Sequence, residues 1–203
     1  MNKIIFLFLF CFIIGCYQKQ STINLNKNDI ITNIFTDKEI LQLESIVVFT
    51  DSLITSKNKD KDISSAYHDY FNFLATFDDN NEFLKKLEID RPIYVKFVDS
   101  LKEKEIFDKI WIIEKGFGRD RQKIICEDLA LNMNGKYLLF LKKYSKVNTD
   151  FRYYYEANSE IGDFAPSASM KFIAEHKKND FNDPIIRLIA SIHLISIKYR
   201  KDY

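Results

Sequence analysis

The chain has 203 residues, with 30 lysines and arginines, 29 aspartates and glutamates, and a formal net charge of +1. This near-neutral balance argues against the strongly basic surface of nucleic-acid-binding proteins, so we expect no nucleic-acid partner. The length suits one domain with a sizeable hydrophobic core.

The first element is a short apolar run, FLFLFCFIIGC, which follows the positive charge of Lys3. The run from Ile4 to Ile14 is too short to span a bilayer comfortably, since a transmembrane helix needs about 20 apolar residues. A charged start, an apolar stretch of this length and a small residue at its end are the ordered parts of a secretory signal peptide. An uncleaved anchor is the alternative.

The residues Ile13-Ile14-Gly15-Cys16 resemble the lipobox of bacterial lipoproteins. The resemblance covers only the start of the chain. It implies that signal peptidase II removes residues 1–15 and that Cys16 carries a diacylglycerol thioether and often a further acyl group. Two or three acyl chains make a membrane anchor effectively permanent. The resemblance therefore implies a lipid-anchored protein of the bacterial cell envelope, and the lack of acidic residues after Cys16 favours the periplasmic side.

Removal of residues 1–15 takes away one lysine and no acid, which leaves a formally neutral mature chain. Residues 16–33 are polar and rich in asparagine without a clear period, so we interpret them as a flexible lipidated tether. Residues 34–203 then form a single helical domain. Its one cysteine, Cys126, lies between apolar neighbours and is expected to be a buried, unreactive thiol.

The hydrophobic periods of the domain predict an all-α, irregular multi-helix bundle. A capping box of Thr36 and Glu39 starts the first helix, which should end before the charged residues 56–62. A second amphipathic helix carries an aromatic stripe over residues 63–77 and is expected to pack against the first as a hairpin. The stripe is interpreted as core, with a hydrophobic ligand groove as the alternative.

The middle of the chain has a less regular pattern. Pro92 predicts a helix that starts near Asp90, and its apolar face is expected to continue through Ile110 and Trp111. A loop is predicted over residues 114–123.

The dipeptide Asn134-Gly135 is a hairpin signal between partly alternating apolar residues. A small β-hairpin near Asn134-Gly135 is therefore one possibility for this segment. We favour a turn that caps a helix over residues 136–144, because the apolar side chains there follow steps of three and four. Further along, a short helix, a loop around Gly162 and a new helix capped by Ser167 are expected.

The last helix is the best specified. Asp183 is a natural N-cap, Pro184 suits the first helical position, and apolar residues then occupy nearly all sides, so this helix should be central. Arg187 and His193 are its polar exceptions. We interpret His193 as a satisfied core residue, and the alternative is that Arg187 and His193 contact a ligand inside the bundle.

Signatures of catalysis are missing from the sequence. The three histidines, His68, His176 and His193, lack the spacing of a zinc site, so no metal site and no cofactor are predicted. Gly116 and Gly118 lack the third glycine of a phosphate-binding turn, and neither Ser167 nor Ser169 has the spacing of a known nucleophile motif.

These observations predict a binding or interaction module of the cell envelope that is docking, structural or toxin-neutralising, with a protein partner. The alternative is an envelope enzyme or small-ligand carrier with a site between the aromatic helices and the last helix. A deep pocket lined by His193, Arg187 and a carboxylate would favour the alternative, and a filled core would favour the interaction module.

Overall fold

The computed structural model describes residues 23–56, 60–76, 82–118 and 123–203. The predicted signal peptide and the proposed lipid attachment site, Cys16, lie outside these residues. The described chain is mostly helical with a small three-stranded antiparallel sheet, which confirms the predicted fold class. No helix in this part of the chain combines the length and apolar character needed to cross a bilayer.

The described elements, in chain order, are the following helices and strands: η2 Leu25–Lys27, α1 Asp29–Thr32, α2 Asp37–Ser56, α3 Ile63–Ala75, α4 Glu82–Glu88, α5 Arg91–Leu101, α6 Phe107–Ile110, β1 Trp111–Phe117, β2 Ile124–Leu131, α7 Lys136–Val147, η3 Thr149–Phe151, α8 Arg152–Ile161, α9 Pro166–Ala174, η4 His176–Lys178, α10 Pro184–Lys198 and β3 Arg200–Asp202.

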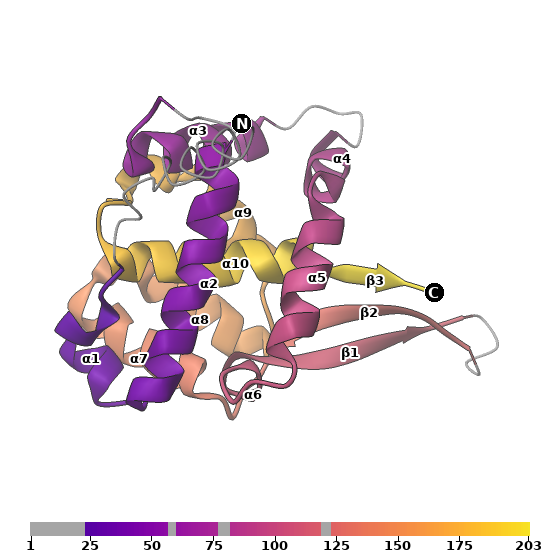
Figure 1. The fold of residues 1–203 in the computed structure, drawn as a ribbon, viewed down its shortest axis with the longest axis horizontal. Coiled ribbons are helices and arrows are strands. Elements are labelled where there is room, and N and C mark those ends of the chain that lie inside the picture. The colour runs from indigo at the N-terminus through magenta and orange to yellow at the C-terminus, as the bar shows by residue number, and fades with distance from the viewer. Residues whose placement is uncertain (1–22, 57–59, 77–81, 119–122) are drawn as a thin grey trace, which may run out of the picture.

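Helix α10 runs through the middle of the bundle and is crossed by α2 (Figure 1). As predicted, Pro184 lies in its first turn, and the Asp183 carboxylate accepts a hydrogen bond from the backbone N–H of Ile185 at 2.7 Å. Most side chains of α10 are buried, because α2, α4, α5 and β2 pack around it. The prediction of a central last helix is confirmed.

The capping box at the start of α2 is also confirmed. The backbone N–H of Thr36 donates to Glu39 Oε2 at 2.8 Å, and the backbone N–H of Glu39 donates to Thr36 Oγ1 at 3.3 Å. Helix α3 packs against α2 as expected, and its aromatic stripe supplies core residues such as Tyr67 and Phe71. Phe77, at the end of the predicted stripe, lies outside the described residues.

The sheet corrects two predictions. Trp111 was expected on a helix, and residues 114–123 were expected to form a loop, but β1 spans Trp111–Phe117 and so includes the first four residues of that loop. Residues 119–122 of the predicted loop lie outside the described residues. Trp111 and Ile113 face Leu131 and Leu129, so one face of the hairpin packs on the core. A short apolar run of this kind fits a helix or a strand equally well by period, and cross-strand packing decides in favour of the strand.

Asn134-Gly135 does not form the turn of this hairpin. Gly135 is the N-cap residue of α7, which confirms the favoured interpretation of a turn that starts a helix. A Cβ atom on Gly135 would lie only 2.5 Å from the carbonyl oxygen of Lys109, so the close approach of the chain from α6 requires glycine here.

Two local predictions are wrong. Residues 23–33 were assigned to the tether, but they form η2 and α1 with Leu25 and Ile31 fully buried, so they belong to the folded domain. Ser167 is not a helix cap, because α9 starts at Pro166 and Ala165 occupies the N-cap position. The side chain of Asn158 compensates by accepting a hydrogen bond from the backbone N–H of Ala165 at 2.8 Å.

Candidate functional site

His193 lies fully buried on α10. Its Nδ1 is 3.0 Å from the hydroxyl of Tyr154 on α8, and its ring meets Phe172 of α9 edge to face. Burial lowers the pKa of His193 to about 3, since the charged imidazolium would lose its hydration. Nε2 has no hydrogen-bond partner among the described residues. The imidazole is therefore neutral, and only one of its two nitrogens is satisfied, with the phenol of Tyr154 as its partner.

Arg187 belongs to a separate buried polar cluster. Its NH1 donates to Asp51 Oδ2 of α2 at 2.6 Å, and the hydroxyl of Tyr67 on α3 donates to Asp51 Oδ1 at 2.8 Å. Burial raises the pKa of Asp51, although the guanidinium and the phenol both favour its ionised form. The ion pair and the hydrogen bond from Tyr67 together join α2, α3 and α10 within the interior.

The structure does not bring the two predicted ligand-binding residues together. The partner of Arg187, Asp51, lies on α2, whereas the side chains that contact His193 lie on α8 and α9. Neither residue lines either of the two surface recesses described below. Asp51, the carboxylate of this interior, bonds to Arg187 and Tyr67 and not to His193.

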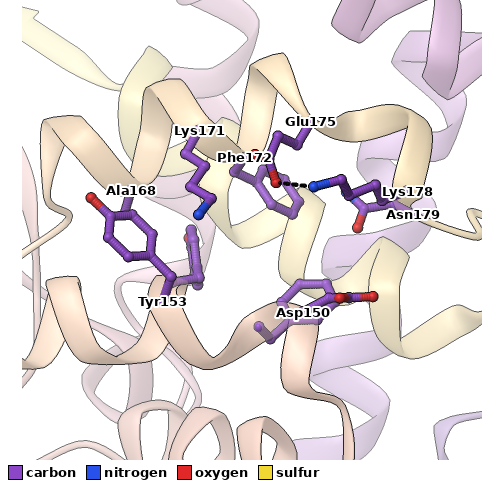
Figure 2. A pocket seen from close by; sticks show the side chains of 10 residues that line it. Asp150, Tyr153, Ala168, Lys171, Phe172, Glu175, Lys178 and Asn179 are labelled. Atoms are coloured by element: carbon purple, nitrogen blue, oxygen red, sulfur yellow. Dashed lines mark hydrogen bonds and ion pairs between the residues drawn. The ribbon is translucent and has the colours of Figure 1, made fainter.

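The first recess is a small cleft between α8 and α9, with a volume of about 40 Å³. Tyr154 and Phe172 line it, and both contact His193 behind them. Figure 2 shows Lys171 reaching toward Tyr153, with its Nζ 4.3 Å from the ring centroid. Such a volume is close to that of a single water molecule and far below the roughly 300–1,000 Å³ of ordinary ligand pockets.

The second recess is an open groove between α5 and β3, with a volume of about 450 Å³. Its side chains are mostly charged, and they include four basic and two acidic residues: Arg91, Lys96, Asp99, Arg200, Lys201 and Asp202. Two ion pairs tie part of this charge internally, Lys201 to Asp99 at 3.7 Å and Arg200 to Asp202 at 2.8 Å. The groove can hold a polar chain segment, and it has no enclosed reaction chamber.

The sequence did not predict a pairing of histidines between α3 and η4. His68 Nδ1 lies 3.0 Å from His176 Nδ1, and His176 Nε2 donates to Asn72 Oδ1 at 3.0 Å. Nδ1 of His176 must then accept the hydrogen bond, which Nδ1–H of His68 donates. Burial, helped by the neighbouring imidazole, lowers the pKa of His176 to about 4. Residues more than a hundred positions apart meet here, and no local pattern indicates such a contact.

The described residues contain no group of three or more His, Cys, Asp or Glu side chains arranged to hold a metal ion. Cys126 is buried, as predicted, and its thiol lies 3.7 Å from Asp128 Oδ2. Comparison of the chain with models of protein families, with curated proteins and with solved structures gave no match.

Proposed function

We propose that the chain is a lipid-anchored interaction module of the bacterial cell envelope, held by acylated Cys16 and facing the periplasm. The anchor rests on the lipobox-like Ile13-Ile14-Gly15-Cys16 and on the short apolar run before it. The interaction role rests on one structural observation: the polar residues of the interior, Arg187 and His193, bond to neighbouring helices, while the wider described recess opens outward.

The position of this recess supports the proposal. Helix α1, which follows the proposed anchor segment, and strand β3 lie at opposite ends of the long axis of the domain (Figure 1). An anchor before α1 would leave the α5–β3 groove directed away from the membrane, where a periplasmic protein partner can reach it.

The alternative, an envelope enzyme or small-ligand carrier, is supported by the α8–α9 cleft and the half-satisfied His193 behind it. The volume of about 40 Å³ limits this cleft to water or the tip of a side chain. The interaction module is therefore the function that the geometry supports better.

Two experiments test the two parts of the proposal. Cys16→Ser should abolish incorporation of labelled fatty acid and block processing by signal peptidase II, and normal labelling of this variant would refute the anchor. For the interaction, a photo-crosslinking amino acid at Val95 in the groove should give a discrete adduct in intact cells. The same group at Leu41 of α2, which is 64% exposed, serves as the control. Absence of an adduct at Val95, or equal adducts at both positions, would contradict a docking role for the groove.

A further inference from the structure

The outer face of α7 differs from the rest of this formally neutral chain. Three exposed lysines, Lys142, Lys143 and Lys146, lie there between two exposed aliphatic side chains, Leu139 and Val147. The spacing of three and four residues places all five on one side of the helix. Leu139 is 46% exposed and Val147 is 71% exposed, so the apolar groups are available to a partner.

Charge on this face is of one sign. Helix α7 contains no acidic residue, and its remaining lysine, Lys136, is held by an ion pair with Glu39 at 2.5 Å. The neighbouring helix α8 exposes Glu156 and Glu160 together with Arg152, so it does not share the purely cationic character of α7. Lysines interleaved with aliphatic groups on one helix face are typical of helices that lie on anionic bilayers.

The length of the chain before the domain specifies where this face lies. Ile23, the first described residue, is seven positions beyond Cys16, and an extended segment of that length reaches at most about 25 Å. Helix α1 follows directly and packs against α7 (Figure 1). An anchor at Cys16 therefore keeps α7 close to the bilayer.

We propose that the outer face of α7, defined by Leu139, Lys142, Lys143, Lys146 and Val147, docks on the surface of an anionic phospholipid bilayer and so fixes the orientation of the domain. The inference rests on the proposed anchor for its geometry. The lysines pair with lipid phosphates, the aliphatic groups enter the interface between them, and the α5–β3 groove is directed away from the membrane.

Tryptophan quenching tests the contact directly. The chain has one tryptophan, Trp111, and it is fully buried, so a second tryptophan reports on its own position. The full chain with Val147→Trp is reconstituted into vesicles of brominated phosphatidylcholine with about a third phosphatidylglycerol. We expect strong quenching with Val147→Trp and none with Phe117→Trp, which is 52% exposed at the far end of the hairpin. Neutral vesicles should give little quenching at either position.

Charge variants test the chemistry. Each lysine near an anionic surface strengthens binding roughly fivefold, so replacing Lys142, Lys143 and Lys146 by glutamine should weaken docking on the order of 100-fold. The matched control replaces three exposed lysines outside α7 and outside the α5–β3 groove, Lys85, Lys104 and Lys115, by glutamine and should leave quenching intact. Acetylation of the unsubstituted chain is a second measurement, and the three α7 lysines should be protected only on anionic vesicles.

Three results would overturn the inference: no quenching at Val147→Trp, equal quenching in neutral vesicles, or equal loss in both triple variants. Flotation of the chain with vesicles at high salt reports separately on the anchor. A chain that floats without quenching at Val147→Trp would retain the proposed anchor and lose the docking face. Quenching without flotation at high salt would retain the docking face and refute the proposed anchor.

Discussion

The hydroxyl of Tyr154 lies 3.0 Å from Nδ1 of His193, and both side chains are buried where α8, α9 and α10 meet. The contact ties the central helix to the cleft side of the domain without using a charge, because burial lowers the pKa of His193 to about 3. His193, a neutral imidazole with one fixed hydrogen-bond partner, therefore has a structural role at this position.

His193→Ala should therefore destabilise the domain. The substitution removes a hydrogen-bond partner of Tyr154 and leaves a cavity beside Phe172, which together cost about 2–4 kcal/mol. Chemical denaturation or the melting temperature without added ligand measures the effect. Tyr154→Phe, which removes only the hydroxyl, should cost about 1 kcal/mol. An unchanged or raised melting temperature for His193→Ala would indicate a residue held for a ligand rather than for the fold.

Stability should fall as the pH is lowered below about 6.5. Burial lowers the pKa of His176 to about 4 and that of His193 to about 3, so the unfolded chain takes up protons at a pH where the folded chain does not. The stability that the two neutral imidazoles contribute is complete above the unfolded pKa of about 6.5, and it is lost as the pH falls toward their folded pKa values. Each histidine should lower the free energy of unfolding by about 1.4 kcal/mol per pH unit between pH 6 and pH 5.

Urea unfolding at pH 7, 6 and 5 measures this dependence of stability on pH. His193→Phe removes one titrating imidazole and should reduce the slope by the contribution of that one proton. Burial raises the pKa of Asp51, so protonation of this carboxyl opposes the loss of stability as the pH falls toward its folded pKa. The difference between the unsubstituted chain and His193→Phe therefore isolates the histidine contribution. Equal stability at pH 7 and pH 5 would be incompatible with the buried neutral imidazoles.

The ion pair between Asp51 and Arg187 gives a third prediction. Asp51→Ala should cost about 3–5 kcal/mol, because it leaves the guanidinium buried without its partner. Combining Asp51→Leu with Arg187→Met removes both charges and should recover most of that loss. Free energies of unfolding of the single and double variants form the test. A double variant no more stable than Asp51→Ala would show that the pair is not an isolated structural contact.

Gly135→Ala should destabilise the junction of β2 and α7. A methyl group there would lie 2.5 Å from the carbonyl oxygen of Lys109 and 2.9 Å from that of Asn132, and backbone cannot yield as a side chain can. Overpacking of this kind costs about 1–3 kcal/mol. Gly162→Ala is the comparison, since its strain comes from a φ of 81° in open surroundings. Equal melting temperatures for Gly135→Ala and the unsubstituted chain would contradict the close approach.

Local signals in the sequence were sufficient for α2, α7 and α10, whose caps and periods lie within a few residues of each other. The sheet was not predictable in this way, because β1 is a strand only by pairing with β2, and β3 pairs with β2 through the distant contact of Asp202 with Cys126. Residues 23–33 looked like a tether because too few apolar residues show a period. Their three buried side chains, Ile23, Leu25 and Ile31, contribute to stability only once the rest of the core is in place.

The separate surroundings of Arg187 and His193 were unpredictable for a similar reason. A sequence shows that the two residues share a helix, but their partners decide their roles, and those partners come from three other helices, α2, α8 and α9. Lys198 shows the same limit. It is fully buried, and its Nζ donates to the carbonyl oxygens of Lys86 and Ile89 at the end of α4, a contact that no local pattern indicates.

The central position of α10 has a consequence for biosynthesis. The apolar faces of α2, α4 and α5 close on a helix that is made after all of them, so the core cannot assemble while residues up to 183 are emerging from the ribosome. Earlier helices can form locally, but their apolar surfaces stay exposed until α10 is made, and chaperones recognise such surfaces. Under the export proposed above, this delay has a use, because a polypeptide that cannot fold from its first half stays extended enough to pass through a narrow translocation channel until its last helix is made.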